Sequence, residues 1–165
     1  MIALSLFGQS VLGTGSQNFL DFLKVQKVAV RENQKVIPVP HDYGRISDIA
    51  ESRSCYRNCT LYSLWEDRLT YHEGVARSEG LDLWMPHAWL VSNHNVIYDP
   101  TWSLLSKSGE VQKASYYGVA IPKEVVRFHI SNGEHYGVLL DDRGQFDPST
   151  VGRFPEIYKD IPDAG

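Results

Sequence analysis

Long apolar runs and clusters of basic residues are both missing from this sequence of 165 residues. No apolar run approaches the ~20 residues that a membrane-spanning helix needs, so no such helix is expected. Lys and Arg form no stripe and the formal net charge is −4, which argues against a protein that binds nucleic acid. The apolar segment at residues 1–16 lacks the basic start and the cleavage pattern of a secretion signal. We therefore expect a protein that works away from membranes and nucleic acid.

Cysteine is also scarce, since Cys55 and Cys59 are the only two. Two cysteines are too few for a disulfide framework, and a cytoplasmic location, where thiols stay reduced, is the simplest expectation. A hydrophobic fraction of 42% with 12% aromatic residues is typical of a globular chain rather than a disordered one. At this length we expect a single domain over residues 1–165, without internal repeats.

The spacing of apolar residues changes from helical to strand-like along the chain. Residues 16–30 carry apolar side chains at near-helical spacing and predict a helix with Ser16 as its N-cap. A second helix is predicted from about residue 54 to residue 68, after a loop or extended segment broken by proline and glycine. Beyond it, six short segments rich in β-branched and aromatic residues predict strands. These segments cover residues 69–78, 87–91, 95–99, 116–121, 125–130 and 136–140.

Helices followed by a run of strands predict an α+β fold with an antiparallel sheet. Within the single domain, we expect the functional core at about residues 50–130. Residues 1–45 then form an accessory helix and an extended segment, and the tail at about residues 150–165 lies on the surface.

The segment MPHAWLVSNHNVIYDPTW, residues 85–102, places His87 in one predicted strand and Asp99 at the end of the next. Facing residues of an antiparallel pair have a constant sum of residue numbers. A three-residue loop pairs Ser92 with Val96, which gives a sum of 188 and puts His87 and Asp99 on one face, a diagonal step apart. A loop of two or four residues puts them on opposite faces. With the odd loop the two side chains can form an oriented pair; otherwise His87 is an ordinary strand histidine bonded to the backbone.

Cys55 supplies a candidate nucleophile for such a pair. It stands where the polar stretch ESRS gives way to the apolar-periodic stretch CYRNCTLYSLW, which is the first turn of the predicted helix. A thiolate is stabilised at a helix N-terminus and beside an imidazolium. The first-turn N–H groups can also receive the oxyanion of a tetrahedral intermediate. Cys59 lies one turn further into the helix, and we expect it to be a buried packing residue.

Two polar residues near the cysteines are expected to support the site. Asn58 either bonds a loop or contacts the substrate, or it is a polar residue on the helix surface. Glu73 lies on the predicted strand between the cysteine helix and the strand of His87. It either binds a substrate amine or holds Arg53 or Arg57 in place, or it is a charge on an edge strand.

Two tryptophans accompany the predicted pair. Trp89 shares a strand face with His87 because strand side chains alternate with a period of two. Trp102 follows Asp99 closely in the sequence. The two tryptophans either shield the Asp–His bond or simply pack in the core.

Short motifs in a fixed order resemble a pattern of small phage and bacterial proteins with a papain-like or transglutaminase-like core. The pattern is C-Y-x-N-A, Y-x-E-G, H-A-W-L-V, D-P-T-W and Y-Y/F-G-V. This sequence matches it at Cys55–Cys59, Tyr71–Gly74, His87–Val91, Asp99–Trp102 and Tyr116–Val119. The resemblance covers about residues 53–121, and it departs from the pattern at Cys59, where the pattern has a small residue. Peptidases that remove the leader of lasso peptides share a looser arrangement of a Cys followed by His-Ala-Trp.

The resemblance implies a cysteine-bearing helix packed on an antiparallel sheet and a Cys-His-Asp site made of Cys55, His87 and Asp99. Such a site predicts a cysteine-dependent hydrolase or acyl transferase that acts on an amide, an ester or a thioester and needs no cofactor. The expected partner is a peptide, protein or small acyl substrate. A host protein is a further partner if the chain is encoded by a phage.

Two other interpretations stay open. Cys55 and Cys59 share a helix face and, with His87 or His72, would make three zinc ligands. Their spacing is not that of a C-x-x-C knuckle, and we expect no metal. A triad-like fold can also serve as a non-enzymatic module that binds a partner protein, for example as a phage inhibitor of a host system. Such a module has no need of a reactive thiol.

Overall fold

The computed structural model describes residues 14–26, 28, 30–43, 50–81, 83–106, 112–133, 135–141, 145–147 and 150. The elements follow in the order α1 (Thr14–Val25), β1 (Arg31–Lys35), a 3₁₀ turn η1 (His41–Tyr43), α2 (Cys55–Trp65), β2 (Leu69–Ser78), β3 (Met85–Ser92), β4 (Ile97–Tyr98), α3 (Trp102–Ser106), β5 (Lys113–Ile121) and α4 (Lys123–Ser131). Apart from residue 150, the predicted surface tail lies outside the described residues.

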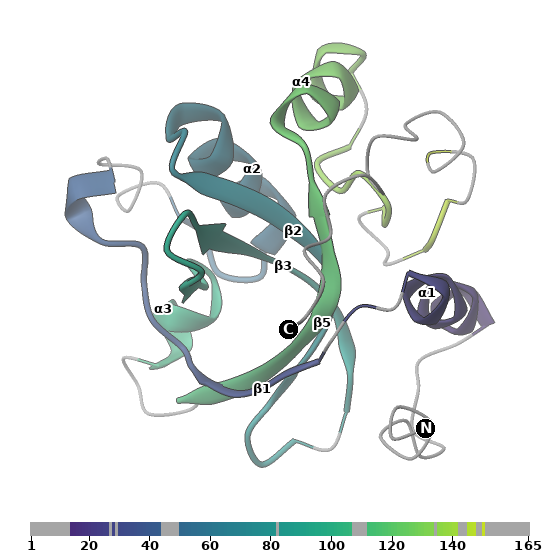
Figure 1. The fold of residues 1–165 in the computed structure, drawn as a ribbon, viewed down its shortest axis with the longest axis horizontal. Coiled ribbons are helices and arrows are strands. Elements are labelled where there is room, and N and C mark those ends of the chain that lie inside the picture. The colour runs from purple at the N-terminus through teal and green to yellow at the C-terminus, as the bar shows by residue number, and fades with distance from the viewer. Residues whose placement is uncertain are drawn as a thin grey trace.

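The five strands form one antiparallel sheet in the order β1-β5-β2-β3-β4, which confirms the predicted α+β fold. The sheet curls until its two edges approach each other (Figure 1). Arg31 of β1 donates from Nη1 to Oδ1 of Asn95 at 3.0 Å, and from Nη2 to the carbonyl of Asn95 at 2.8 Å. The N–H of Asp99 donates to the carbonyl of Ile37 at 2.9 Å. Asp99 therefore lies at the seam of the sheet, where the segment that follows β4 contacts the segment that follows β1.

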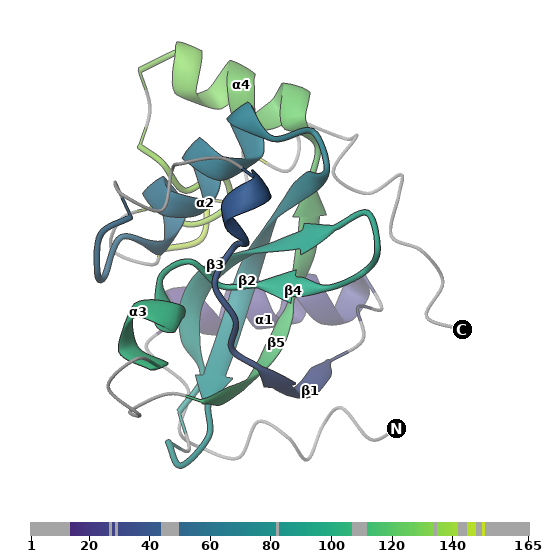
Figure 2. The same ribbon diagram turned by 90° about the vertical axis from the view of Figure 1, so that its left-hand side faces the viewer.

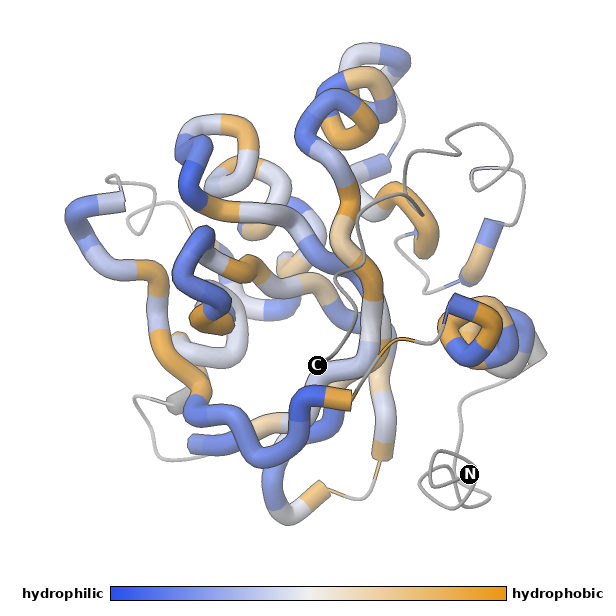
Figure 3. The backbone as a smooth tube through the Cα atoms, in the orientation of Figure 1, coloured by the Kyte–Doolittle hydropathy of each residue, from blue (hydrophilic) through white to orange (hydrophobic). Residues whose placement is uncertain are grey.

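Alternate residues of each strand point to opposite faces of the curled sheet. Helices α1, α2 and α4 lie outside it (Figures 1 and 2), and with the outer face of the strands they enclose the larger core. Both apolar and polar residues occur around α1 and α4 (Figure 3), as expected for helices that cover a sheet on one side. The largest fully buried side chains of this core include Phe19, Leu20, Leu23, Tyr62, Tyr71, Leu90, Ile121, Leu139 and Leu140.

The inner face carries a smaller and more aromatic cluster. Its buried members are Val36, Ala76, Trp89, Val91, Ile97, Trp102, Ala114 and Tyr116. His87 lies two residues before Trp89 on β3 and so points to the same inner face. The sheet thus separates a large apolar layer from a small aromatic one.

Two glycines let β2 and β5 approach beneath this aromatic cluster. Gly74 and Gly118 face each other in the register of the two strands. A Cβ at Gly118 would lie 2.2 Å from the carbonyl oxygen of Glu73 and 2.4 Å from Cη2 of Trp89. Only glycine therefore leaves room for the indole of Trp89 to lie against the strand.

The strand predicted at residues 125–130 is wrong, because this segment belongs to α4. Val125, Val126 and His129 are buried, whereas Arg127 and Phe128 are exposed, which is the period of a helix. Its β-branched residues favoured a strand, but packing of one helical face against the core overrides that weak preference.

Two further expectations are corrected at the ends of the described chain. The segment predicted as a strand at 136–140 makes only an isolated bridge, between Leu140 and Phe146. The first helix spans Thr14–Val25 rather than residues 16–30, so Ser16 lies inside it and is not its N-cap.

None of the helices in the described part of the chain has the length and apolar character that a membrane crossing requires.

Candidate active site

The β3–β4 hairpin has the register that brings the predicted pair together. Leu90 pairs with Tyr98 and Val91 with Ile97, which is the sum of 188 expected for a three-residue loop. The N–H of Ser92 also donates to the carbonyl of Val96 at 2.9 Å. The odd loop is therefore confirmed.

His87 and Asp99 meet as predicted. Nε2 of His87 lies 2.7 Å from Oδ2 of Asp99, and the two residues are 3% and 0% exposed. Because β4 has only two residues, the chain leaves the ladder after Tyr98. Asp99 can then fold back towards His87 instead of continuing along the strand. A hydrogen bond at this distance in a buried site is strongly charge-assisted when the imidazole is protonated.

Backbone N–H groups hold the other oxygen of the Asp99 carboxylate. Oδ1 accepts from the N–H of Thr101 at 3.1 Å and from the N–H of Trp102 at 2.8 Å, at the start of α3. An aspartate just before a helix commonly binds first-turn N–H groups in this way. With Oδ1 held by α3, Oδ2 points to the inner face of the sheet. There it also accepts a hydrogen bond from the Tyr116 hydroxyl, at 3.0 Å.

Aromatic rings enclose the His87 imidazole. The Trp102 ring lies 4.3 Å from it, centroid to centroid, at an interplanar angle of 22°. The Trp89 ring lies 6.5 Å from it at 18°. The aromatic shield over the Asp–His bond is therefore confirmed for Trp102, while Trp89 both stacks on His87 and packs in the inner core. The two rings exclude water, which strengthens the interaction of His87 with Asp99.

Cys55 is the first residue of α2, as the sequence predicts, and it is partly exposed. The helix packs against β2 and β3, and Cys55 lies near enough to His87 to raise the pKa of its imidazole. Since Nε2 of His87 is occupied by Asp99, Nδ1 is the ring nitrogen left for the thiol. Burial lowers the pKa of His87, but the charges of Asp99 and Cys55 and the hydrogen bond to Asp99 outweigh it and raise this pKa to about 10. The imidazole is therefore cationic at neutral pH.

Asn58 joins the turn before Cys55 to the segment after Asp99. It is 1% exposed, so the interpretation as a surface residue is wrong. Its Nδ2 donates to the carbonyl of Glu51 at 2.7 Å and to Oγ1 of Thr101 at 3.0 Å, and its Oδ1 accepts from the N–H of Glu51 at 3.1 Å. Bonding to a loop, one of the expected roles, is confirmed. These bonds fix the start of α2 relative to Asp99.

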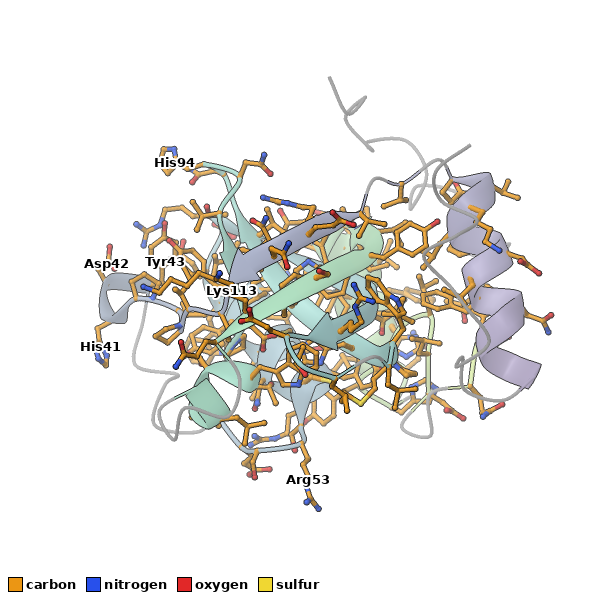
Figure 4. The ribbon with its side chains drawn as sticks, turned by 90° about the horizontal axis from the view of Figure 1, so that it is seen from below. His41, Asp42, Tyr43, Arg53, His94 and Lys113 are labelled. Carbon is orange, nitrogen blue, oxygen red and sulfur yellow. The ribbon has the colours of Figure 1, made fainter. Side chains whose placement is uncertain are left out.

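The turn that leads into α2 has an unusual backbone conformation. Arg53 has φ of 62°, in the left-handed region that non-glycine residues seldom adopt. Such strain persists only where the surroundings impose it, and it is enriched at functional sites. The Arg53 side chain is exposed and points away from the body of the protein (Figure 4).

Glu73 has a different environment from the one predicted. It lies on β2, which has a strand on each side, so it is not a charge on an edge strand. Its carboxylate faces the outer core and accepts from the Tyr71 hydroxyl at 2.9 Å, the Val138 N–H at 2.7 Å and the Leu139 N–H at 2.6 Å. Burial raises the pKa of Glu73 to about 7 although these hydrogen bonds act to lower it. At 0% exposure it is closed to a substrate amine.

The arginines proposed as partners of Glu73 lie elsewhere. Arg57 forms an ion pair with Glu51, Nη1 to Oε1 at 3.4 Å, and Arg53 is exposed. The predicted arginine–Glu73 contact is therefore wrong. The prediction failed because β2 becomes a central strand only when β5 pairs beside it, and no local sequence pattern indicates that pairing.

Cys59 is buried and reduced, as expected. Burial raises the pKa of its thiol well above the ordinary value, and the charges of Asp99, Cys55 and Glu73 add to the increase. A thiol kept protonated in this way is a poor metal ligand. His72, another suggested ligand, stacks on the Trp89 ring at 6.0 Å. Among the residues that the structure describes, no group of three His, Cys, Asp or Glu side chains is arranged to hold a metal ion.

Sequence reasoning missed Tyr116 and Thr101 as partners of this site. Both lie in short motifs that resemble the phage and bacterial pattern, and this was the available signal. Tyr116 reaches Asp99 only because β5 crosses beside β2, far from the hairpin in sequence.

Searches of the chain against models of known families, curated proteins and solved structures return no match.

Proposed function

We propose that this protein is a cysteine-dependent hydrolase or acyl transferase on a papain-like or transglutaminase-like core. Cys55 is the nucleophile, His87 transfers the proton, and Asp99 orients the imidazole. The observation that carries the proposal is the buried hydrogen bond between His87 and Asp99, with Cys55 at the first turn of α2 near enough to raise the pKa of the imidazole. The substrate is an amide, an ester or a thioester.

Because the His87 imidazole is cationic at neutral pH, the reaction begins from the Cys55 thiolate, and His87 already holds the proton that the thiol has given up. The thiolate attacks the carbonyl carbon of the substrate, and the carbonyl π pair moves to oxygen to form a tetrahedral oxyanion. First-turn N–H groups of α2 are the donors available to that oxyanion, because such groups have no acceptor within the helix. The oxyanion then collapses, the bond to the leaving group breaks, and His87 gives that group its proton.

The acyl group is now a thioester on Cys55. Water or an amine attacks it while His87 takes the proton of the attacking group, and Cys55 leaves as a thiolate. Asp99 keeps the imidazole in one orientation through both halves of the reaction and stabilises its cationic form. The Trp102 ring limits access of water to this pair without covering Cys55, which is partly exposed.

Alkylation of the thiol tests the proposal without knowledge of the substrate. Iodoacetamide is added between pH 5 and 9, and the labelling rate of each cysteine is followed by peptide mass spectrometry. We expect Cys55 to be labelled readily at pH 6, where a model thiol of pKa ~8.5 is almost inert. Cys59, buried in the same molecule, is the internal control and should stay unlabelled.

Two variants connect the labelling to the proposed roles. His87→Ala removes the imidazolium beside the thiol, so labelling of Cys55 at pH 6 should fall to that of the model thiol. Asp99→Asn should change labelling less, but should lower turnover of an activated ester strongly, because the imidazole loses its orientation. An ordinary thiol profile for Cys55 that His87→Ala leaves unchanged would refute the enzyme and favour a protein-binding module.

A further inference from the structure

We propose that Tyr116 is a positioning residue that moderates the Asp99–His87 pair by sharing one carboxylate oxygen with the imidazole. Its hydroxyl donates to Oδ2 of Asp99 at 3.0 Å, and Nε2 of His87 lies 2.7 Å from that same atom. The consequence for turnover rests on the proposed function. The consequence for the titration of His87 does not.

The surroundings fix the hydroxyl of Tyr116 in place. Tyr116 comes from β5 and is 1% exposed. The centroid of its ring lies 5.1 Å from that of Trp89 and 6.3 Å from that of Trp102. Since a buried hydroxyl without a partner costs free energy, Tyr116 stays bonded to the acceptor in front of it, Oδ2 of Asp99.

The carboxylate cannot turn to separate its two partners. Oδ1 of Asp99 is held by the N–H groups of Thr101 and Trp102. Oδ2 is then the oxygen to which both His87 and Tyr116 are bonded. The two donors therefore compete for the negative charge of one oxygen atom.

This competition depends on the protonation of His87. When the imidazole is neutral, the carboxylate carries an uncompensated charge and binds the Tyr116 hydroxyl strongly, because hydrogen bonds to a charged acceptor are the stronger ones. When the imidazole is protonated, it neutralises Oδ2 and the hydroxyl is bound less strongly. Tyr116 thus stabilises the neutral imidazole more than the cationic one, and it makes His87 a better proton donor.

A proton that His87 holds too firmly would slow the departure of the leaving group. The carboxylate and the burial around it favour a tightly held proton, and Tyr116 offsets part of that effect. Loss of its hydroxyl should therefore leave His87 more basic and the acyl transfer slower.

The test measures the titration of His87 by the NMR shifts of its ring carbons. The background is Cys55→Ala, which removes the thiol that also raises the pKa of His87 and so lowers the midpoint of the titration. In this background His87 has Asp99 and Tyr116 as its titratable neighbours on the inner face. His72 stacks on the same Trp89 ring and is followed in the same spectra.

Two variants are compared in that background, Tyr116→Phe and the matched control Tyr71→Phe. Tyr71 also donates to a buried carboxylate, Glu73, at 2.9 Å, but on the outer face of the sheet. Both variants therefore lose the same kind of bond, while only the first loses contact with Asp99. We expect the His87 midpoint to rise by about half a pKa unit or more in Tyr116→Phe and to stay unchanged in Tyr71→Phe.

A midpoint that stays or falls in Tyr116→Phe, or that rises equally in Tyr71→Phe, would overturn the proposal. With Cys55 intact, kcat for an activated ester should fall several-fold in Tyr116→Phe with little change in KM, and should not fall in Tyr71→Phe. If the intact protein has an unreactive Cys55, the proposed function fails. The titration of His87 then still decides the role of Tyr116.

Discussion

Glu73 should make the protein less stable as the pH rises from about 4.5 to about 7. In the unfolded chain its carboxyl group loses the proton near the ordinary pKa of 4.5, whereas burial raises the pKa in the folded protein to about 7. Between these values the unfolded state binds fewer protons than the folded state. The free energy of unfolding therefore falls with rising pH in this window and is level above it.

The size of the effect follows from the distance between the two pKa values of Glu73. At 1.36 kcal/mol per unit, a rise from 4.5 to about 7 corresponds to about 3 kcal/mol of unfolding free energy. The carboxyl group is fully buried, so screening by solvent reduces this free energy only slightly. Three donors bond to it, yet the cost of burying the charge outweighs them.

His72 acts in the opposite direction and has to be separated from Glu73. Burial lowers the pKa of His72 to about 4, so protonation favours the unfolded state and stability rises between pH 4 and 6.5. His87, whose pKa is raised to about 10, contributes stability below pH 6.5 that is lost as the pH rises through 10. Both groups remain in a variant of Glu73, so the difference between wild type and variant isolates the carboxyl group.

The assay is urea unfolding of wild type, Glu73→Gln and Tyr71→Phe at pH 4.5 and 7.5. The amide of Gln has one acceptor oxygen, so Glu73→Gln leaves one donor unpaired and should be less stable at pH 4.5 by about 1–3 kcal/mol. At pH 7.5 the wild type has lost about 3 kcal/mol through Glu73 and the variant has not, so the gap should close or reverse. Tyr71→Phe keeps the carboxyl group and loses a bond that acts to lower its pKa, so its stability should still fall as the pH rises. An equal gap at both pH values would refute this reasoning.

Three other substitutions test how the site is supported. Cys59→Ala should cost about 1–2 kcal/mol in urea unfolding, because Cys59 is 0% exposed, and should leave the iodoacetamide labelling of Cys55 unchanged. Asn58→Ala loses two hydrogen bonds to the backbone of Glu51 and one to buried Thr101, so it should lower the unfolding free energy by about 2–3 kcal/mol and slow the labelling of Cys55. Gly118→Ala places a Cβ 2.2 Å from a backbone oxygen of β2, and should lower the unfolding free energy by about 3 kcal/mol or more.

The features that local rules govern could be predicted from the sequence. The register of the β3–β4 hairpin follows from the length of its loop, and it places His87 and Asp99 on one face. The change from polar to apolar-periodic sequence locates Cys55 at the first turn of α2. Both inferences use residues that are near each other in the chain.

What could not be predicted depends on contacts between distant segments. β5 pairs beside β2, which makes Glu73 a central rather than an edge residue and brings Tyr116 to Asp99. The N–H of Asp99 bonds to Ile37 across the seam, and no local pattern indicates that closure. The helix α4 was missed for a related reason, since its β-branched residues are decided by packing against the core and not by their own preference.

The register of β2 explains why Asp99, and not Glu73, is the carboxylate that pairs with His87. Glu73 faces Ala88 across the β2–β3 ladder, and the next residue, Gly74, faces His87. A slip of one residue would turn every side chain of β2 to the other face and would bring a carboxylate towards the cationic imidazole. Gly74 prevents a slipped pairing, because any Cβ at its present position would lie 2.1 Å from the Tyr117 carbonyl oxygen. The space next to the imidazole on β2 therefore stays empty of side chains, and the orientation of His87 is left to Asp99 at the seam.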